Sequence, residues 1–173
     1  PPSRGRTRDG SHAPYDGNEV AASILDSARG LDDAVARATL LQAEVEITLF
    51  DGMTTDALDD AVIQVALGNA KDDLAFDTIA SRIAVKKLYK EVFGDTHDDL
   101  GDVDPERVQD LHRNYFPRTI AKLVADGHLD ERLGRDFDLE TLAAALDPTR
   151  DDLIGFMGVR TMINRYLLRT PDK

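Results

Sequence analysis

The stretch DDLAFDTIASRIAVKKLYKEVF, residues 72–93, has the clearest helical period in the chain. Its apolar residues recur three or four positions apart, which is the spacing of one helix face. They are Phe76, Ile79, Ala80, Ile83, Ala84 and Leu88. Gly94 follows directly, and glycine commonly ends a helix. The stretch therefore predicts a long helix over residues 72–93.

Upstream of this stretch the same spacing predicts three more helices. They lie at about 18–29, at about 32–50, and from Thr54 or Thr55 onward. Threonine is a favoured N-cap residue, so either of these two residues can begin the third helix. The apolar positions of the three helices are Val20, Ile24, Leu25, Leu41, Val45, Leu49, Leu58, Val62 and Val65.

The beginning of the chain has a different pattern. Asp9-Gly10 is its strongest turn signal, because a type I′ hairpin turn needs positive φ at its central residues. Short strands at about 4–8 and 11–15 would flank this turn. The sequence therefore predicts a small β-hairpin ahead of the helices.

A polar, acidic link at residues 95–103 is the expected boundary between two regions, residues 1–94 and 95–173. Beyond it, Asp104-Pro105 is an N-cap followed by proline at the first helical position. The helix that starts there should be broken or restarted at Pro117 and end near residue 125. Further helices are expected at 138–146 and, with Leu153, Met157, Ile163 and Leu167, at 150–168. The predicted fold class is mainly α: a small N-terminal β-hairpin packed on four helices, followed by a second helical subdomain.

Composition excludes several classes of function. The net charge is -12, and a long-range field of that sign repels nucleic acid and anionic membranes. The chain contains no cysteine, which removes disulfides, cysteine zinc sites and thiol nucleophiles. The four histidines show no metal-ligand spacing, so no metal held by protein side chains is expected. With no signal peptide and no long apolar run, a soluble, cytoplasmic protein is expected.

Two groups of segments resemble a known family. Arg8-Asp9-Gly10, then Tyr15-Asp16, then FDGMTT at 50–55 resemble the ATP-cone, the allosteric nucleotide-binding module of ribonucleotide reductases. The remainder is similar to the helical N-terminal domain of class I large subunits. The segments that carry this second likeness are AVKKLYK at 84–90, LHRNYFP at 111–117, LDPTRDDL at 146–153 and NRYLLR at 164–169. Together the resemblance covers roughly residues 4–169.

The resemblance implies an effector site for ATP or dATP, with Mg²⁺ accompanying the triphosphate. Arg8 and Lys90 would meet the phosphates, and Thr55 would offer its hydroxyl beside a helix N-terminus. Asp16 would read the adenine edge, and Asp59 stands where some members carry a residue that matters for dATP inhibition. Asp9 and Gly10 would form the turn of the hairpin that holds the nucleotide.

By the same resemblance, the chain is the regulatory N-terminal part of a ribonucleoside-diphosphate reductase large subunit. That enzyme uses a thiyl radical and a cysteine pair, so a chain without cysteine is expected to be non-catalytic by itself. Its expected partners are the remainder of the large subunit, in the same or a separate chain, and a radical-generating small subunit. An oligomer is expected, since effectors in this family favour different subunit assemblies.

Several features leave alternatives open. The family's usual lysines before Arg8 and after Asp16 are replaced by Thr7 and Glu19, which favours a non-enzymatic helical assembly module with a vestigial cone. In an arbitrary helix, Lys86 and Lys90 would simply be an exposed face. A repressor that joins an ATP-cone to a zinc ribbon would need about four close Cys or His ligands, which the chain lacks. A class II or III reductase stays possible, because cones also occur there.

Overall fold

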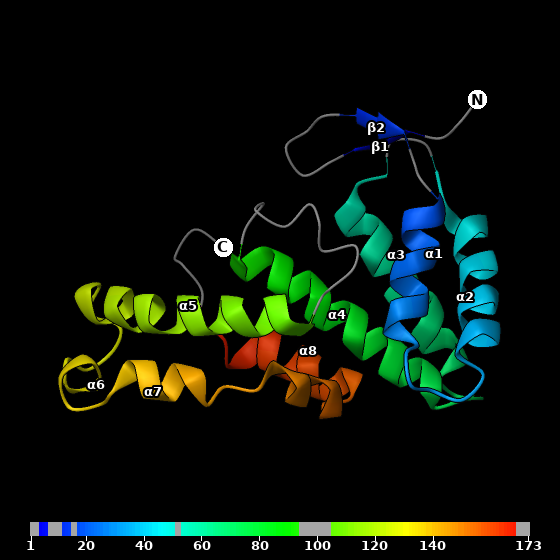
Figure 1. Ribbon diagram of the computed structural model, residues 1–173. Helices are drawn as coiled ribbons and strands as arrows, with labels where there is room; N and C mark the ends of the chain where they lie inside the picture. The colour runs from blue at the N-terminus through cyan, green and yellow to red at the C-terminus, as the bar shows by residue number, and fades with distance from the viewer. Residues whose placement is uncertain (1–3, 7–11, 15–16, 51–52, 94–104, 169–173) are drawn as a thin grey trace. The chain divides into compact units, whose positions relative to one another are not determined.

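The computed structural model describes residues 4–6, 12–14, 17–50, 53–93 and 105–168 (Figure 1). These residues are mainly helical, which confirms the mainly α part of the predicted fold class. None of the helices in these ranges is both long and apolar enough to cross a membrane. By their internal contacts the residues fall into two compact units, 1–92 together with 152–173, and 93–151.

The beginning of the first unit contains two strands of three residues each, β1 (Arg4–Arg6) and β2 (His12–Pro14). They pair antiparallel, with Arg4 opposite Pro14, Gly5 opposite Ala13 and Arg6 opposite His12. The predicted turn at Asp9-Gly10 falls in residues 7–11, which lie outside the described residues. The turn type, and the packing of this pair on the helices, therefore stay predictions.

Among the described residues, five α-helices make up most of the rest of the first unit. They are α1 (Gly17–Ser27), α2 (Ala34–Thr48), α3 (Thr55–Asn69), α4 (Ala75–Phe93) and α8 (Phe156–Arg165). Gly30, with φ +72, lies in the turn that follows α1, where glycine tolerates the left-handed conformation best. The Asp73 carboxylate stabilises the start of α4, because its Oδ1 accepts the backbone N–H of Ala75. Its Oδ2 binds Arg37 of α2 at 2.7 Å.

Aliphatic residues from all five helices form the core of the first unit. The members less than 2% exposed are Ile24 of α1, Ala28 in the turn after α1, Leu41 and Val45 of α2, Ala66 of α3, and Ile79 and Ala80 of α4. Phe156 and Val159 of α8 are buried in the same cluster. Full burial of one such large side chain contributes about 1.5–3 kcal/mol, so this cluster is the main source of stability of the unit. Leu25, predicted to share the buried face of α1, is instead 44% exposed.

The second unit contains α5 (Pro105–Ala125), α6 (Arg132–Arg135) and α7 (Leu139–Ala144), followed by the start of a 3₁₀ helix, η2 (Pro148–Leu153). Val108 of α5 and Ala143 of α7 are buried. The rings of His112 and Tyr115 meet Phe93 edge-on, with centroids 5.1 and 5.0 Å away. The Tyr115 hydroxyl donates to the carbonyl of Phe93, so aromatic and polar contacts together hold α5 against Phe93, which belongs to the same unit.

Two predicted helix boundaries are wrong. Pro117 lies inside α5 and does not interrupt it. A proline removes one backbone hydrogen bond, to the carbonyl four residues earlier, and that residue, Arg113, is exposed, so water can satisfy the carbonyl. The second error concerns residues 150–168, which form not one helix but η2 followed by α8. Gly155 separates them with extended backbone, φ -69 and ψ 164.

The late start of α8 also changes which of its residues are buried. Phe156 and Val159 enter the core, whereas the predicted core residues Leu153 and Met157 are 84% and 66% exposed. The compact units likewise place 152–173 with the first region, although residues 95–173 were expected to form one region. Whether the functional domains divide at 94/95 stays a prediction.

Candidate functional site at the start of α3 and the end of α4

The candidate site begins at the N-terminus of α3. Thr54 is the N-cap residue: its backbone is extended, and its side chain accepts the backbone N–H of Ala57 at 3.1 Å. Thr55 is the first helical residue and is exposed. The N-terminus of a helix carries a partial positive charge and outward-pointing N–H groups, so it attracts anions. The Thr55 hydroxyl stands at such a position.

Lysines from the second half of α4 reach the acidic residues of α3. The ammonium group of Lys90 lies 3.6 Å from a carboxylate oxygen of Asp59. That of Lys87 lies 2.6 Å from Asp60 and 3.2 Å from Asp56. Burial opposes the charge on Lys87, but its hydrogen bonds to Asp60 and Asp56 outweigh burial and raise its pKa. Lys87 therefore stays charged at neutral pH beside the start of α3.

Lys86 faces α1 instead. Its ammonium group contacts the Asp26 carboxylate and donates to the Ser23 carbonyl at 3.3 Å. Its side chain is only 11% exposed, so the interpretation of Lys86 and Lys90 as a simple exposed face is wrong for Lys86. Burial lowers the pKa of Lys86, and its contact with Asp26 only partly compensates.

The predicted site residues divide into two groups. Arg8, Asp9, Gly10 and Asp16 lie outside the described residues. Thr55, Asp59 and Lys90 lie within them, and the structure brings Asp59 and Lys90 into contact, with Thr55 one helical turn before Asp59 on α3. Their role in effector binding stays a prediction.

Sequence reasoning missed the carboxylates that pair with Lys86 and Lys87. Asp56 and Asp60 of α3 bind Lys87, and Asp26 of α1 binds Lys86. One signal could have found the first two: Asp56, Asp59 and Asp60 crowd the first turns of one helix, and three lysines crowd the last turns of the next. Over the described residues, no group of three or more His, Cys, Asp or Glu side chains is arranged to hold a metal ion.

The arrangement can attract an anion. Two lysines of α4 contact carboxylates in the first turns of α3, and the N-terminus of α3 carries a threonine hydroxyl. Each of these groups is suited to a phosphate. The carboxylates of α3 oppose this attraction, because they already neutralise the lysines. A ligand at this place must therefore compete with internal ion pairs.

Comparison with known proteins assigns this region to a family. Residues 6–91 match the family model of the ATP cone domain. The chain is 28% identical over 120 residues to the ribonucleoside-diphosphate reductase subunit alpha of Chlamydia pneumoniae, which covers 69% of this chain and 11% of that protein. It is 26% identical over 167 residues to the corresponding subunit of Helicobacter pylori, covering 94% of this chain and 18% of that protein.

A vertebrate relative gives the same result. The chain is 27% identical over 169 residues to the ribonucleoside-diphosphate reductase large subunit of Danio rerio, covering 96% of this chain and 20% of that protein. The chain thus spans between a tenth and a fifth of the length of these curated relatives. Residues 6–91 are therefore an ATP cone domain, in a chain similar over most of its length to the large subunits of ribonucleoside-diphosphate reductases.

Proposed function

We propose that residues 6–91 bind ATP or dATP, and that the bound nucleotide regulates the reduction of ribonucleoside diphosphates to deoxyribonucleoside diphosphates. The observation that carries the proposal is the contact of Lys90 with Asp59, one turn from Thr55, within a region that matches the ATP cone domain. It places a cation beside the N-terminus of α3, where a triphosphate would find both a positive charge and backbone N–H groups.

In this proposal Lys90, together with Lys87, contacts the phosphates, and the Thr55 hydroxyl hydrogen-bonds a phosphate oxygen. Arg8 adds a second cation from the N-terminal strands, Asp9 and Gly10 form their turn, and Asp16 reads the adenine edge. Asp59, which holds Lys90 at 3.6 Å, is then positioned to affect which nucleotide is inhibitory. Mg²⁺ enters with the triphosphate and is held by phosphate oxygens, which are ligands that this ion prefers.

The larger activity belongs to a complete reductase, because the chain spans only a small part of its relatives. We propose that it acts with the remainder of the large subunit, with a radical-generating small subunit, in an oligomer and in the cytoplasm. ATP would permit and dATP would inhibit the reaction, by favouring different assemblies. With no cysteine of its own, the chain contributes regulation and not the radical chemistry.

Titration calorimetry of the purified chain with ATP and dATP, in the presence of Mg²⁺, tests the proposal. We expect measurable heat with both nucleotides, and Lys90→Ala should weaken binding about tenfold or more, since a hydrogen bond to a charged group contributes about 1.5–3 kcal/mol. Lys71→Ala is the matched control: this lysine is exposed beyond the opposite end of α3 and should bind like the wild type. An equal loss of nucleotide affinity in both variants would mean that net charge alone attracts the nucleotide.

A second candidate function is a helical assembly module whose cone no longer binds nucleotide. The pairing of Lys87 with two carboxylates and of Lys90 with Asp59 favours it, because ion pairs must be exchanged before a phosphate can bind. Thr7 and Glu19, where the family usually has lysines, favour it as well. Absence of both heat and thermal stabilisation with ATP and with dATP would support this module and overturn the nucleotide site.

A further inference from the structure

A segment far outside residues 6–91 completes the first compact unit. The backbone N–H of Phe156, at the start of α8, donates to the Asp77 carboxylate of α4 at 3.2 Å. The Ser81 hydroxyl of α4 donates to the carbonyl of Ile154. Phe156 and Val159 are 8% and 3% exposed and belong to the same core as α1–α4. Residues 152–165 are thus fixed to α4 by polar contacts and by burial.

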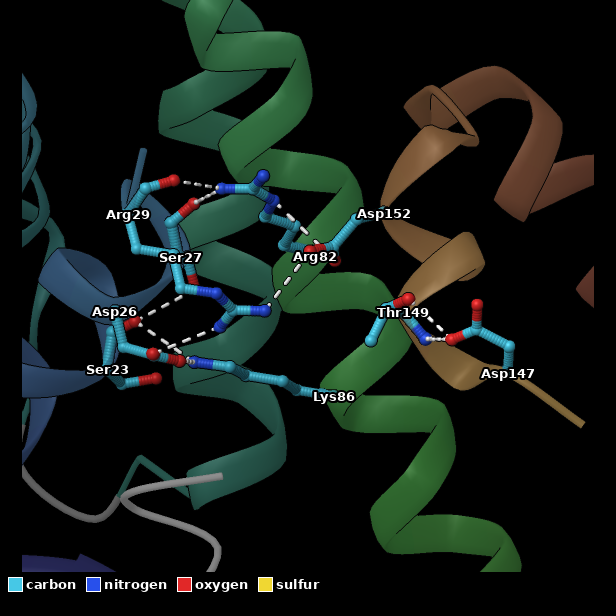
Figure 2. Close-up of polar contacts among 9 residues, drawn as sticks. All are labelled: Ser23, Asp26, Ser27, Arg29, Arg82, Lys86, Asp147, Thr149 and Asp152. Carbon is cyan, nitrogen blue, oxygen red and sulfur yellow. Dashed lines mark hydrogen bonds and ion pairs between the residues drawn. The ribbon is translucent and has the colours of Figure 1, made fainter. Parts of the chain in front are cut away.

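Asp152 joins this segment to α1 and α4 at once (Figure 2). Its carboxylate binds the guanidinium groups of Arg29, at 3.1 Å, and of Arg82, at 3.6 Å. Arg82 also donates to the carbonyls of Ser27, at 3.1 Å, and Arg29, at 2.8 Å. These carbonyls lie at the end of α1, where the helix dipole favours a cation. Asp152 therefore binds both cations at the place where α1 ends against α4.

The same ion pairs continue toward the candidate nucleotide site. Arg29 binds Asp26 at 3.1 Å, and Asp26 contacts Lys86, which lies one turn before Lys90 on α4. Figure 2 shows this row of side chains running from Lys86 through Asp26 and Arg29 to Asp152 and Arg82. We call these five residues the ionic row. Neighbouring residues in the row carry opposite charges. When one residue loses a partner, the charge that acts on the following residue therefore changes as well.

Burial makes the ionic row sensitive to such changes. The side chains of Lys86 and Arg82 are 11% and 15% exposed, and those of Asp26 and Asp152 are 24% and 30% exposed. The Nε of Arg82 is buried and makes no hydrogen bond within the described part of the chain, so Asp152 supplies its opposing charge. A partly buried charge that loses its partner is costly, so the four partly buried groups should rearrange together, with Arg29, whose side chain is 47% exposed, as the link between them.

We propose that residues 152–165 are the output element of the nucleotide site, coupled to it through Asp152. The proposal rests on the proposed function. A triphosphate near Lys90 adds negative charge that draws the Lys86 ammonium group away from Asp26. Asp26 then depends on Arg29 alone and competes with Asp152 for it. Asp152 responds by shifting toward Arg82, and with it the start of α8 moves, since Ile154 and Phe156 are tied to the same helix.

Hydrogen exchange of the full chain, followed by mass spectrometry with and without ATP, tests this coupling. In the wild type, ATP should slow exchange at least threefold in peptides from residues 156–165 as well as in those from α3. In Asp152→Asn, calorimetry should still detect ATP binding and α3 should still be protected, but the protection of 156–165 should be lost. Because coupling is reciprocal, this variant should also change the ATP dissociation constant.

Asp147→Asn is the matched control, because Asp147 binds Thr149 at the start of η2 and touches neither α1 nor α4 among the contacts described here. It should behave like the wild type. If the wild type binds ATP but 156–165 does not respond, or if Asp152→Asn responds as fully as the wild type, the coupling is refuted and the nucleotide site stands. If the wild type shows no heat with ATP, the nucleotide site itself fails, and the coupling fails with it.

Discussion

At the scale of single residues, the most constrained charges are Lys86 and Asp26. Burial lowers the pKa of Lys86, because the charged ammonium group is held away from water. Burial also acts to raise the pKa of Asp26, but the hydrogen bond and charge of Lys86, followed by those of Arg29, outweigh it and lower this pKa. Asp26 therefore stays ionised in the folded state and stabilises two cations.

This pair predicts a specific response to acid. A carboxyl group whose pKa is lower in the folded than in the unfolded state stabilises the fold at pH values above its unfolded-state pKa. This stabilisation is lost as the pH falls through the folded-state pKa. Asp26→Asn should be less stable than the wild type by about 1–3 kcal/mol at pH 7, since Lys86 and Arg29 lose a partner. The gap should begin to shrink below about pH 4, where the carboxyl of the unfolded chain starts to bind protons, and should close only below the lowered pKa of the folded state.

Denaturant unfolding at pH 7 and near pH 3 measures the gap. Asp130→Asn is the control, because Asp130 binds Arg132 at the surface of the second unit, and such exposed pairs contribute little. A gap between Asp26→Asn and the wild type that stays constant into strong acid would show that the carboxylate charge is not what Asp26 contributes.

At the scale of elements, two helical glycines predict opposite effects of the same substitution. Gly68 in α3 has nothing within 4 Å of an added Cβ, so Gly68→Ala should stabilise the protein by about 0.5–1 kcal/mol through helix propensity. A Cβ on Gly158 of α8 would lie 2.7 Å from Cγ2 of Ile154, which packs against the core. Gly158→Ala should therefore destabilise the protein despite the better propensity.

Thermal unfolding of the two variants measures in one experiment whether each substitution raises or lowers the stability. Stabilisation by Gly158→Ala equal to that of Gly68→Ala would mean that Ile154 can move aside without cost. In that case the close approach of α8 to residue 154 is not a determinant of packing.

Pro117 gives a second prediction at this scale. Pro117→Ala should restore a backbone N–H that can donate to the carbonyl of Arg113 within α5. The gain is offset by greater freedom of the unfolded chain, about 0.4–1 kcal/mol, so we expect net stabilisation of about 1 kcal/mol or more. Urea unfolding monitored by circular dichroism measures it. A destabilised variant would indicate that the proline ring contributes packing that outweighs the lost hydrogen bond.

Elements with strong local signals were predictable from the sequence. The stretch at 72–93 corresponds to α4, and the choice of Thr54 or Thr55 is settled with Thr54 as the N-cap. The break expected at Pro117 is wrong because proline's local preference does not include the packing of Tyr115 on Phe93, which holds this helix in place. The division of 150–168 was missed because the partners of Gly155 and Phe156, above all Asp77, lie on a distant helix.

At the scale of the whole molecule, the resemblance of motifs groups Thr55, Asp59 and Lys90 into one candidate site. The structure brings Asp59 and Lys90 into contact, and the role of the three residues in binding stays a prediction. The ionic row was not predictable, because Arg29 and Asp152 are 123 positions apart, and the segment LDPTRDDL that contains Asp152 does not indicate its partner. Long-range ion pairs of this kind carry no periodic signal, since each end looks like an ordinary solvated charge.

The discontinuous first unit has a consequence for how the protein is made. During synthesis the part that matches the ATP cone domain leaves the ribosome first, and about sixty residues of the second unit must follow before α8 emerges. Until then the nascent chain exposes the apolar surface that Phe156 and Val159 later cover, and Arg82 lacks its ion-pair partner Asp152. Closing so long a loop costs conformational entropy. A chain that ended at residue 91 would not have this cost, but its core would lack α8.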